Sequence, residues 1–171
     1  MKPVINKLVI ILISTIPFNF YGQSANLSNQ EIIDLKYMLE EEKVAHDVYD
    51  YLDKKWHLKI FGNIKQSEQR HMEMVEYLLN SYKVSYQFSD EQGMFYNEHL
   101  QNMYNDLIEK GSKSEFDALE VGKMIEVVDI EDLEKALKKT TNSDISQVYS
   151  TLIFASNNHL RAFNRNLSRF N

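Results

Sequence analysis

Glu68 and His71 are three residues apart in a segment whose apolar residues recur every three or four positions, as in a helix. Both side chains therefore project from one face of that helix. Glu-x-x-His on an inward face is an arrangement with which helical bundles hold two metal ions between facing helices. The pair alone is common by chance, so its meaning depends on what the other helices present.

Further carboxylates and a second histidine occupy positions on helical stripes where leucine or valine would be expected. The candidate metal ligands are Glu42, Glu68, His71, Glu126, Asp129 and His159. Burying an unpaired carboxylate costs several kcal/mol, so something must compensate for these charges. Carboxylate oxygens with two imidazoles suit iron or manganese, and bridging carboxylates can hold two ions about 3.5–4 Å apart. The sequence therefore predicts a di-metal site for iron or manganese.

Some of these residues also have a structural interpretation. Asp129 begins the segment Asp-Ile-Glu-Asp, which could cap a new helical segment after a kink. His159 could be a core histidine that pairs with a neighbouring carboxylate, and Glu68 with His71 could be an ordinary helix-surface pair. The side chains interpreted as solvated or flanking are those of Glu40, Glu41 and His46.

Long helices must position these side chains. The only prolines are Pro3 and Pro17, and beyond them the chain has few glycines and many helix-forming residues. Ser28 and Glu31 predict a capping box at the start of the first helix, and Gly111 is expected to terminate a short one. The predicted helices span about 29–52, 61–82, 97–110, 114–139 and 143–169, with a loop at 83–96. We predict an all-α fold, a four-helix bundle with an additional short helix in the crossover.

Four short segments carry a family resemblance. They are Glu42-Lys-Val-Ala-His-Asp-Val-Tyr49, Ser67-Glu-Gln-Arg-His71, Ile125-Glu-Val-Val-Asp-Ile130 and Asn158-His-Leu-Arg-Ala-Phe163. They look like the ferritin-like domain of unknown function 2202, over residues 35–163, and this resemblance implies a ferritin-like bundle. A more distant similarity to rubrerythrins implies Glu42, Glu68 and His71 as iron ligands. In the same pattern, Glu126 matches the glutamate of the third metal-binding helix.

The last helix departs from that pattern. Where rubrerythrins and related ferritin-like proteins have Glu-x-x-His, this chain has Ser156-Asn-Asn-His159. Asp129 lies about one helical turn after Glu126 and could restore the missing carboxylate from the third long helix. Otherwise the site would hold one metal or bind metal weakly.

The N-terminal segment and the composition indicate where the protein is located and which kinds of partner are excluded. Residues 1–22 have a basic start and an apolar run at 8–13, the pattern of a signal peptide. That run is shorter than the roughly 20 residues of a membrane span, so we expect a secreted or periplasmic domain of residues 23–171 without a stable span. The absence of cysteine excludes disulfides, Cys-ligated zinc and iron–sulfur clusters. A formal net charge of −6 disfavours nucleic acid as a partner.

Two functions remain open. The leading hypothesis is a metal-dependent redox protein, ferroxidase-like or peroxidase-like, whose iron reacts with oxygen or peroxide using electrons from Fe(II) or an outside donor. The alternative is a non-catalytic metal-binding or stress-related interaction module. General acid–base hydrolysis has no substrate-pocket signal to support it. No catalytic residue is assigned, and the oligomeric state is open, a homodimer included.

Overall fold

The computed structural model describes residues 26–170, which are almost entirely helical. Its helices are α1 (Asn29–Trp56), α2 (Lys59–Ser81), α3 (Glu98–Gly111), α4 (Glu115–Lys139) and α5 (Ser143–Leu167), followed by the 3-10 helix η1 (Ser168–Phe170). The described residues contain no strand, so the all-α prediction is confirmed. None of these helices has a stretch apolar enough to cross a membrane. The predicted signal peptide at 1–22 lies outside the described residues.

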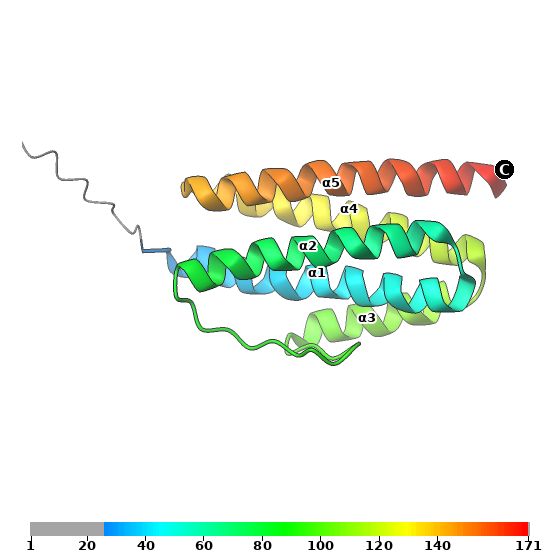
Figure 1. The fold of residues 1–171 in the computed structure, drawn as a ribbon, viewed down its shortest axis with the longest axis horizontal. Helices are drawn as coiled ribbons and strands as arrows, with labels where there is room; N and C mark the ends of the chain where they lie inside the picture. The colour runs from blue at the N-terminus through cyan, green and yellow to red at the C-terminus, as the bar shows by residue number, and fades with distance from the viewer. Residues whose placement is uncertain (1–25, 171) are drawn as a thin grey trace, which may run out of the picture.

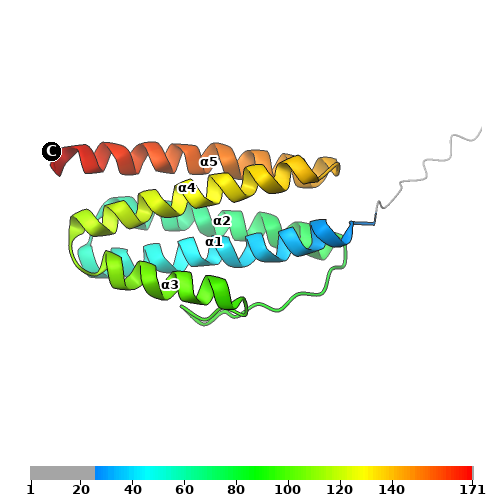
Figure 2. The ribbon, with the colours of Figure 1, turned by 180° about the vertical axis from the view of Figure 1, so that it is seen from behind.

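Two helical hairpins lie against each other. α1 packs antiparallel to α2, and α4 packs antiparallel to α5, while α1 also contacts α4 and α2 contacts α5 (Figure 1). The chain from 82 to 114, which includes α3, runs back along the outside of the bundle and returns to the end where α2 began (Figure 2). As a result, α2 and α4 run parallel, and α3 covers the outer side of α1 and α4.

Side chains cap four of the five helix N-termini. Ser28 and Glu31 form the predicted capping box at α1, in which each side chain accepts a hydrogen bond from the other residue's backbone N–H. The side chains of Asn97, Ser114 and Asn142 accept hydrogen bonds from the first turns of α3, α4 and α5. Local chemistry thus defines where these helices begin, in agreement with the sequence.

Gly111 ends α3, as predicted, but not by adopting a left-handed conformation. It is the last helical residue, and a Cβ there would lie 2.9 Å from Cδ2 of Leu52 on α1. Its carbonyl accepts a hydrogen bond of 2.8 Å from the indole N–H of Trp56. The glycine therefore allows the end of α3 to approach the end of α1.

The outer side of α1 anchors the crossover through charged side chains. The Glu40 carboxylate accepts hydrogen bonds from the backbone N–H groups of Tyr96 (2.6 Å) and Asn97 (3.0 Å). Asp47 accepts one from the N–H of Gly93 at 2.9 Å. Glu40 is only 7% exposed, so its interpretation as a solvated residue was wrong. The periodicity of α1 did not reveal that the helix is covered on both sides.

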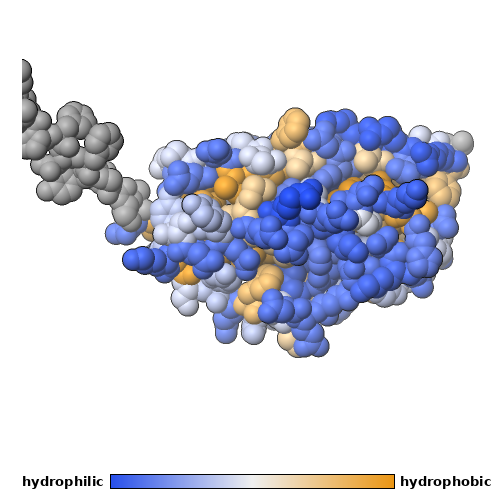
Figure 3. Space-filling model, in the orientation of Figure 1, coloured by the Kyte–Doolittle hydropathy of each residue, from blue (hydrophilic) through white to orange (hydrophobic). Residues whose placement is uncertain are grey.

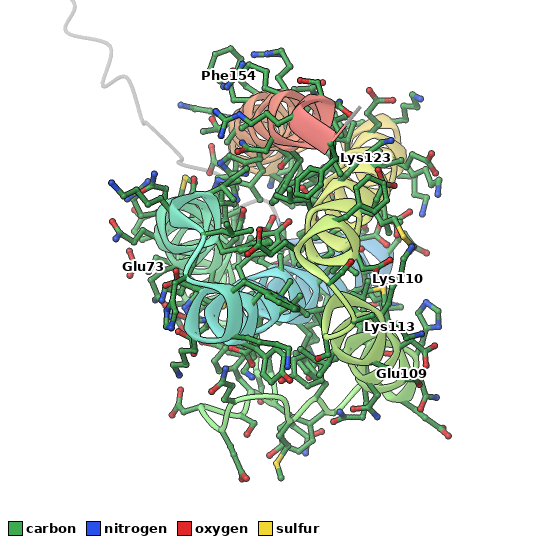
Figure 4. All side chains as sticks on the ribbon, turned by 90° about the vertical axis from the view of Figure 1, so that its right-hand side faces the viewer. Glu73, Glu109, Lys110, Lys113, Lys123 and Phe154 are labelled. Atoms are coloured by element: carbon green, nitrogen blue, oxygen red, sulfur yellow. The ribbon has the colours of Figure 1, made fainter. Side chains whose placement is uncertain are left out.

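A polar layer divides the interior into two apolar clusters. One cluster includes Tyr49, Phe61 and Phe163, and the other includes Leu35 and Leu133. Viewed along the bundle, oxygen atoms lie between the long helices, whereas Glu73 and Lys123 point outward (Figure 4). The outer face in Figure 3 is largely hydrophilic. The polar residues that interrupt the apolar stripes of the helices therefore lie inside the bundle, at its middle.

Gly122 of α4 gives a first prediction, on stability. A Cβ at this position would overlap the ring of Phe163. That ring is fully buried, with its centroid 5.6 Å from that of Tyr49 and 5.8 Å from that of Phe61, so it has no room to move. We expect Gly122→Ala to lower the free energy of unfolding by about 2–3 kcal/mol, measured by urea denaturation.

Gly62→Ala in α2 is the matched control. A Cβ there would meet only the Asp53 carboxylate, at 3.0 Å, and that side chain can turn away. Replacing a glycine inside a helix with alanine should then stabilise it by up to about 1 kcal/mol. Equal effects of the two substitutions would contradict the overpacking argument at Gly122.

Candidate metal centre

The polar layer contains all six side chains predicted as metal ligands. Glu42 comes from α1, Glu68 and His71 from α2, Glu126 and Asp129 from α4, and His159 from α5. The four carboxylates and His71 are each no more than 6% exposed, and the side chain of His159 is 12% exposed. Four separate helices thus place their polar residues at one level of the bundle.

Glu42, Glu68 and His71 form the first of two clusters with metal-ligand spacing. The Nδ1 atom of His71 lies 3.1 Å from Oε2 of Glu42 and 2.7 Å from Oε2 of Glu68. One donor atom from each residue lies within 4.8 Å of the other two. We call this cluster trio 1.

Glu68, Glu126 and His159 form the second cluster, trio 2. The Nδ1 atom of His159 lies 3.0 Å from Oε1 of Glu68 and 3.3 Å from Oε2 of Glu126. The donor atoms again lie within 4.8 Å of one another. Because Glu68 presents one oxygen to each histidine, it is shared by the two trios, whose imidazole rings lie 5.8 Å apart.

Hydrogen bonds among these side chains do not give every buried oxygen and nitrogen atom of the two trios a partner. Each histidine Nδ1 carries at most one hydrogen, yet two carboxylate oxygens approach it. Oε1 of Glu42 is buried without a hydrogen-bond partner, and Oε1 of Glu68 and Nδ1 of His159 are close together but not aligned as a hydrogen bond. Two divalent cations would balance the charges of the four buried carboxylates and leave the imidazoles neutral, as metal ligation requires. The donor set therefore fits two metal ions.

The electrostatics of the metal-free layer reflect this crowding of charges. Burial raises the pKa of Glu42 to about 7, and burial with the charge of Glu68 raises the pKa of Glu126 to about 7. Burial also opposes ionisation of Glu68, but the adjacent imidazoles outweigh it and lower the Glu68 pKa to about 2. Burial disfavours the imidazolium forms, yet the carboxylates raise the pKa of His71 to about 11 and that of His159 to about 9.

Tyr49 is a further member of the layer that the sequence did not single out. Its ring is fully buried. Its hydroxyl, however, donates a hydrogen bond of 2.6 Å to Oε1 of Glu126. That contact directs the other oxygen of Glu126 toward His159. Tyr49 therefore positions a candidate ligand.

Asp129 lies in the layer but outside both trios. The hydroxyl of Ser156 lies 2.5 Å from Oδ2 of Asp129, whereas Oδ1 has no partner. α4 is continuous from Glu115 to Lys139, so the interpretation of Asp129 as the cap of a new segment after a kink was wrong. Ser156 thus holds the aspartate that was considered as the substitute for the missing last-helix glutamate.

Glu41 is buried as well, although the sequence suggested a solvated side chain. It is 4% exposed, and neither of its oxygens has a hydrogen-bond partner. Burial and the neighbouring carboxylates of Asp132 and Glu42 raise its pKa well above the usual value. The sequence could not separate it from Glu42 because consecutive residues on a fully enclosed helix are all buried.

His46, which the sequence suggested as a flanking residue, lies outside the layer. Its Nδ1 atom is 2.9 Å from the Asp47 carboxylate.

Comparisons with known proteins identify a relative with the same fold. A protein of Methanocaldococcus jannaschii, "Uncharacterized protein MJ0754", is 49% identical over 145 residues, which cover 84% of this chain and 78% of the relative. The crystal structure of hypothetical protein MJ0754 superposes with a TM-score of 0.83, covering 84% of this chain and 83% of that one. The profile described as "Uncharacterized protein domain (DUF2202)" matches residues 31–170. The chain therefore belongs to the DUF2202 family.

Proposed function

We propose that this protein is a ferritin-like bundle that binds two divalent metal ions, in the first place iron, with manganese as the alternative. Glu42, Glu68 and His71 would hold one ion, and Glu68, Glu126 and His159 the other. The observation that carries the proposal is the position of Glu68, whose two oxygens face two different histidines. A carboxylate in that position is suited to bridge two ions.

The path of the chain supports the ferritin-like part of the proposal. A single long crossover that leaves the second and third long helices parallel is typical of ferritin-like folds. Here the segment from 82 to 114 makes that crossover between α2 and α4. The similarity of the α1 and α2 motifs to rubrerythrins is consistent with it.

The protein's own residues would bind and orient the ions. Glu68 would be a ligand of both ions, and the hydrogen bond from the Tyr49 hydroxyl would fix the orientation of the Glu126 carboxylate. The apolar clusters on both sides of the layer would exclude water. Bound iron would supply electron-transfer chemistry toward oxygen or peroxide, in a ferroxidase-like or peroxidase-like reaction. Export by the N-terminal segment, with a secreted or periplasmic location, remains part of the proposal.

A second function, metal binding without catalysis, is favoured by one specific contact. Ser156 stands where the ferritin-like pattern has a glutamate, and its hydroxyl donates a hydrogen bond to one oxygen of Asp129, which belongs to neither trio. A centre with fewer carboxylate ligands would store or buffer metal. Peroxide consumption by the iron-loaded protein with an added electron donor separates the two functions, because only the redox protein consumes more than one peroxide per pair of irons.

Metal content is the measurement that tests the common part of both proposals. The protein is purified without chelators or affinity histidines, and its iron and manganese are counted by elemental analysis. We expect about two ions per chain, and loss of both in a Glu68→Ala/His71→Ala variant. His99→Ala serves as the control, because His99 is exposed at the start of α3. Absence of stoichiometric metal from the unaltered protein would contradict the proposal.

A further inference from the structure

Glu41 is a buried carboxyl group that the di-metal centre does not use. It is 4% exposed, both of its oxygens lack hydrogen-bond partners, and it belongs to neither trio. Burying an unpaired carboxylate is costly, and the packing of α1 would be served as well by glutamine or leucine. A residue of this kind requires a reason other than fold stability.

The surroundings of Glu41 connect the bundle surface with the polar layer. Glu41 and Asp129 line one cavity of about 80 Å³ between α1, α3 and α4, whose other walls are apolar. Like Glu41, Asp129 has an oxygen without a hydrogen-bond partner, and its other oxygen accepts a hydrogen bond from Ser156 within the layer. Two buried carboxylates thus face one small space beside the centre.

On its other side, Glu41 neighbours Asp132, whose side chain is 26% exposed. Asp132 lines a separate surface hollow of about 190 Å³ between α1 and α4. Asp132, Glu41 and Asp129 therefore form a series that leads from this hollow to the layer. At the surface, the Lys135 ammonium lies 2.7 Å from Asp132.

We propose that Asp132, Glu41 and Asp129 form a path along which divalent cations reach the di-metal centre. The inference rests on the proposed function, because it needs a centre to fill. An incoming cation displaces Lys135 from Asp132, passes to the unpaired oxygens of Glu41, and is delivered beside Glu42 and Asp129. Oxygen ligands without an imidazole bind such ions loosely enough to release them to the histidine-containing trios.

The rate of metal uptake tests the path. Metal-free full-length protein is mixed with cobalt(II) in a stopped-flow instrument, and the absorbance of the bound ion is followed. We expect Glu41→Gln to slow uptake about tenfold while the final stoichiometry stays at that of the unaltered protein. Asp132→Asn should slow uptake less, because its side chain is partly solvated, and Lys135→Gln should accelerate it.

The control is Glu134→Gln, which removes the same charge from a side chain that is 52% exposed, lies two residues from Asp132 on α4, and pairs with Lys138 and not with Lys135. It should leave the rate within twofold of the unaltered protein. Thermal melting of each metal-free variant verifies folding, and Glu41→Gln should melt no lower than the unaltered protein because the lost carboxylate has no partner.

The outcomes separate the path from the centre. Full cobalt loading of Glu41→Gln at an unchanged rate would overturn the path and leave the centre intact. No cobalt uptake by any variant, the unaltered protein included, would overturn the centre and the path with it. Slower uptake by Glu41→Gln at unchanged stoichiometry and melting temperature supports the path, since a purely structural role of Glu41 predicts a change in stability and no change in the rate of uptake.

Discussion

Glu68→Gln is expected to remove both metal ions from the protein, whereas the same substitution at Glu42 or Glu126 removes mainly one. Glu68 belongs to both trios and presents one oxygen to each histidine. Glutamine keeps the size of the side chain but loses the charge and one of the two ligand oxygens, so it cannot bridge two cations. We expect metal affinity to fall more than about a hundredfold, since the loss exceeds that of a mere supporting contact.

The comparison among the three glutamines is the informative part of the experiment. Isothermal titration of metal-free protein with manganese(II) gives the number and affinity of sites in each variant. We expect two sites in the unaltered protein, one in Glu42→Gln and in Glu126→Gln, and none in Glu68→Gln. Gln69→Ala changes an exposed residue next to Glu68 and should retain both sites. Equal losses in all three glutamine variants would show that the trios do not act as separate sites.

The metal-free protein is expected to be most stable near pH 4.5–5 and to lose stability as the pH rises. The folded-state pKa values of Glu42 and Glu126 are about 7, above the ordinary 4.5, so folding favours their protonated forms and stability falls between pH 4.5 and 7. His71 and His159, with pKa values raised from 6.5 to about 11 and about 9, extend the fall into alkaline pH. Glu68 has a pKa lowered to about 2, and its contribution is lost only as the pH falls from 4.5 toward 2.

Urea denaturation in the presence of a chelator, at pH 5 and pH 8, measures this effect. One pKa unit corresponds to about 1.4 kcal/mol, and the shifted groups share neighbours, so we expect a total loss of about 3 kcal/mol or more. A double variant, Glu42→Gln/Glu126→Gln, should flatten the profile between pH 4.5 and 7 because its amides carry no charge. Stability that is constant or rising from pH 5 to pH 8 would contradict the electrostatics of the layer. Saturating manganese should restore stability at pH 8.

The helices and the inward position of the six candidate ligands could be predicted from sequence because both follow from periodicity. Glu126 and Asp129 interrupt an apolar stripe that continues at Leu133, and all three are buried. The capping box of Ser28 and Glu31 also marks the start of α1. Patterns of this kind depend on residues a few positions apart, which a single sequence displays directly.

The pairing of ligands and the burial of neighbouring acids could not be predicted, because they depend on contacts between distant segments. Glu40 is buried only because the crossover returns to α1 and places the N–H groups of Tyr96 and Asn97 on its carboxylate. The sharing of Glu68 depends on the distance between α2 and α5. Periodicity identifies which face of a helix is apolar, but not what covers the opposite face.

The division of ligands between the two hairpins has a consequence for assembly during synthesis. Trio 1 is complete within the α1–α2 hairpin, because Glu42, Glu68 and His71 all precede residue 72. Trio 2 also needs Glu126 and His159, which are translated last. A nascent chain therefore carries one full set of ligands long before the other half exists. In the proposed centre, the first ion would be bound by half of the molecule, and the second ion would join that half to the remainder of the chain.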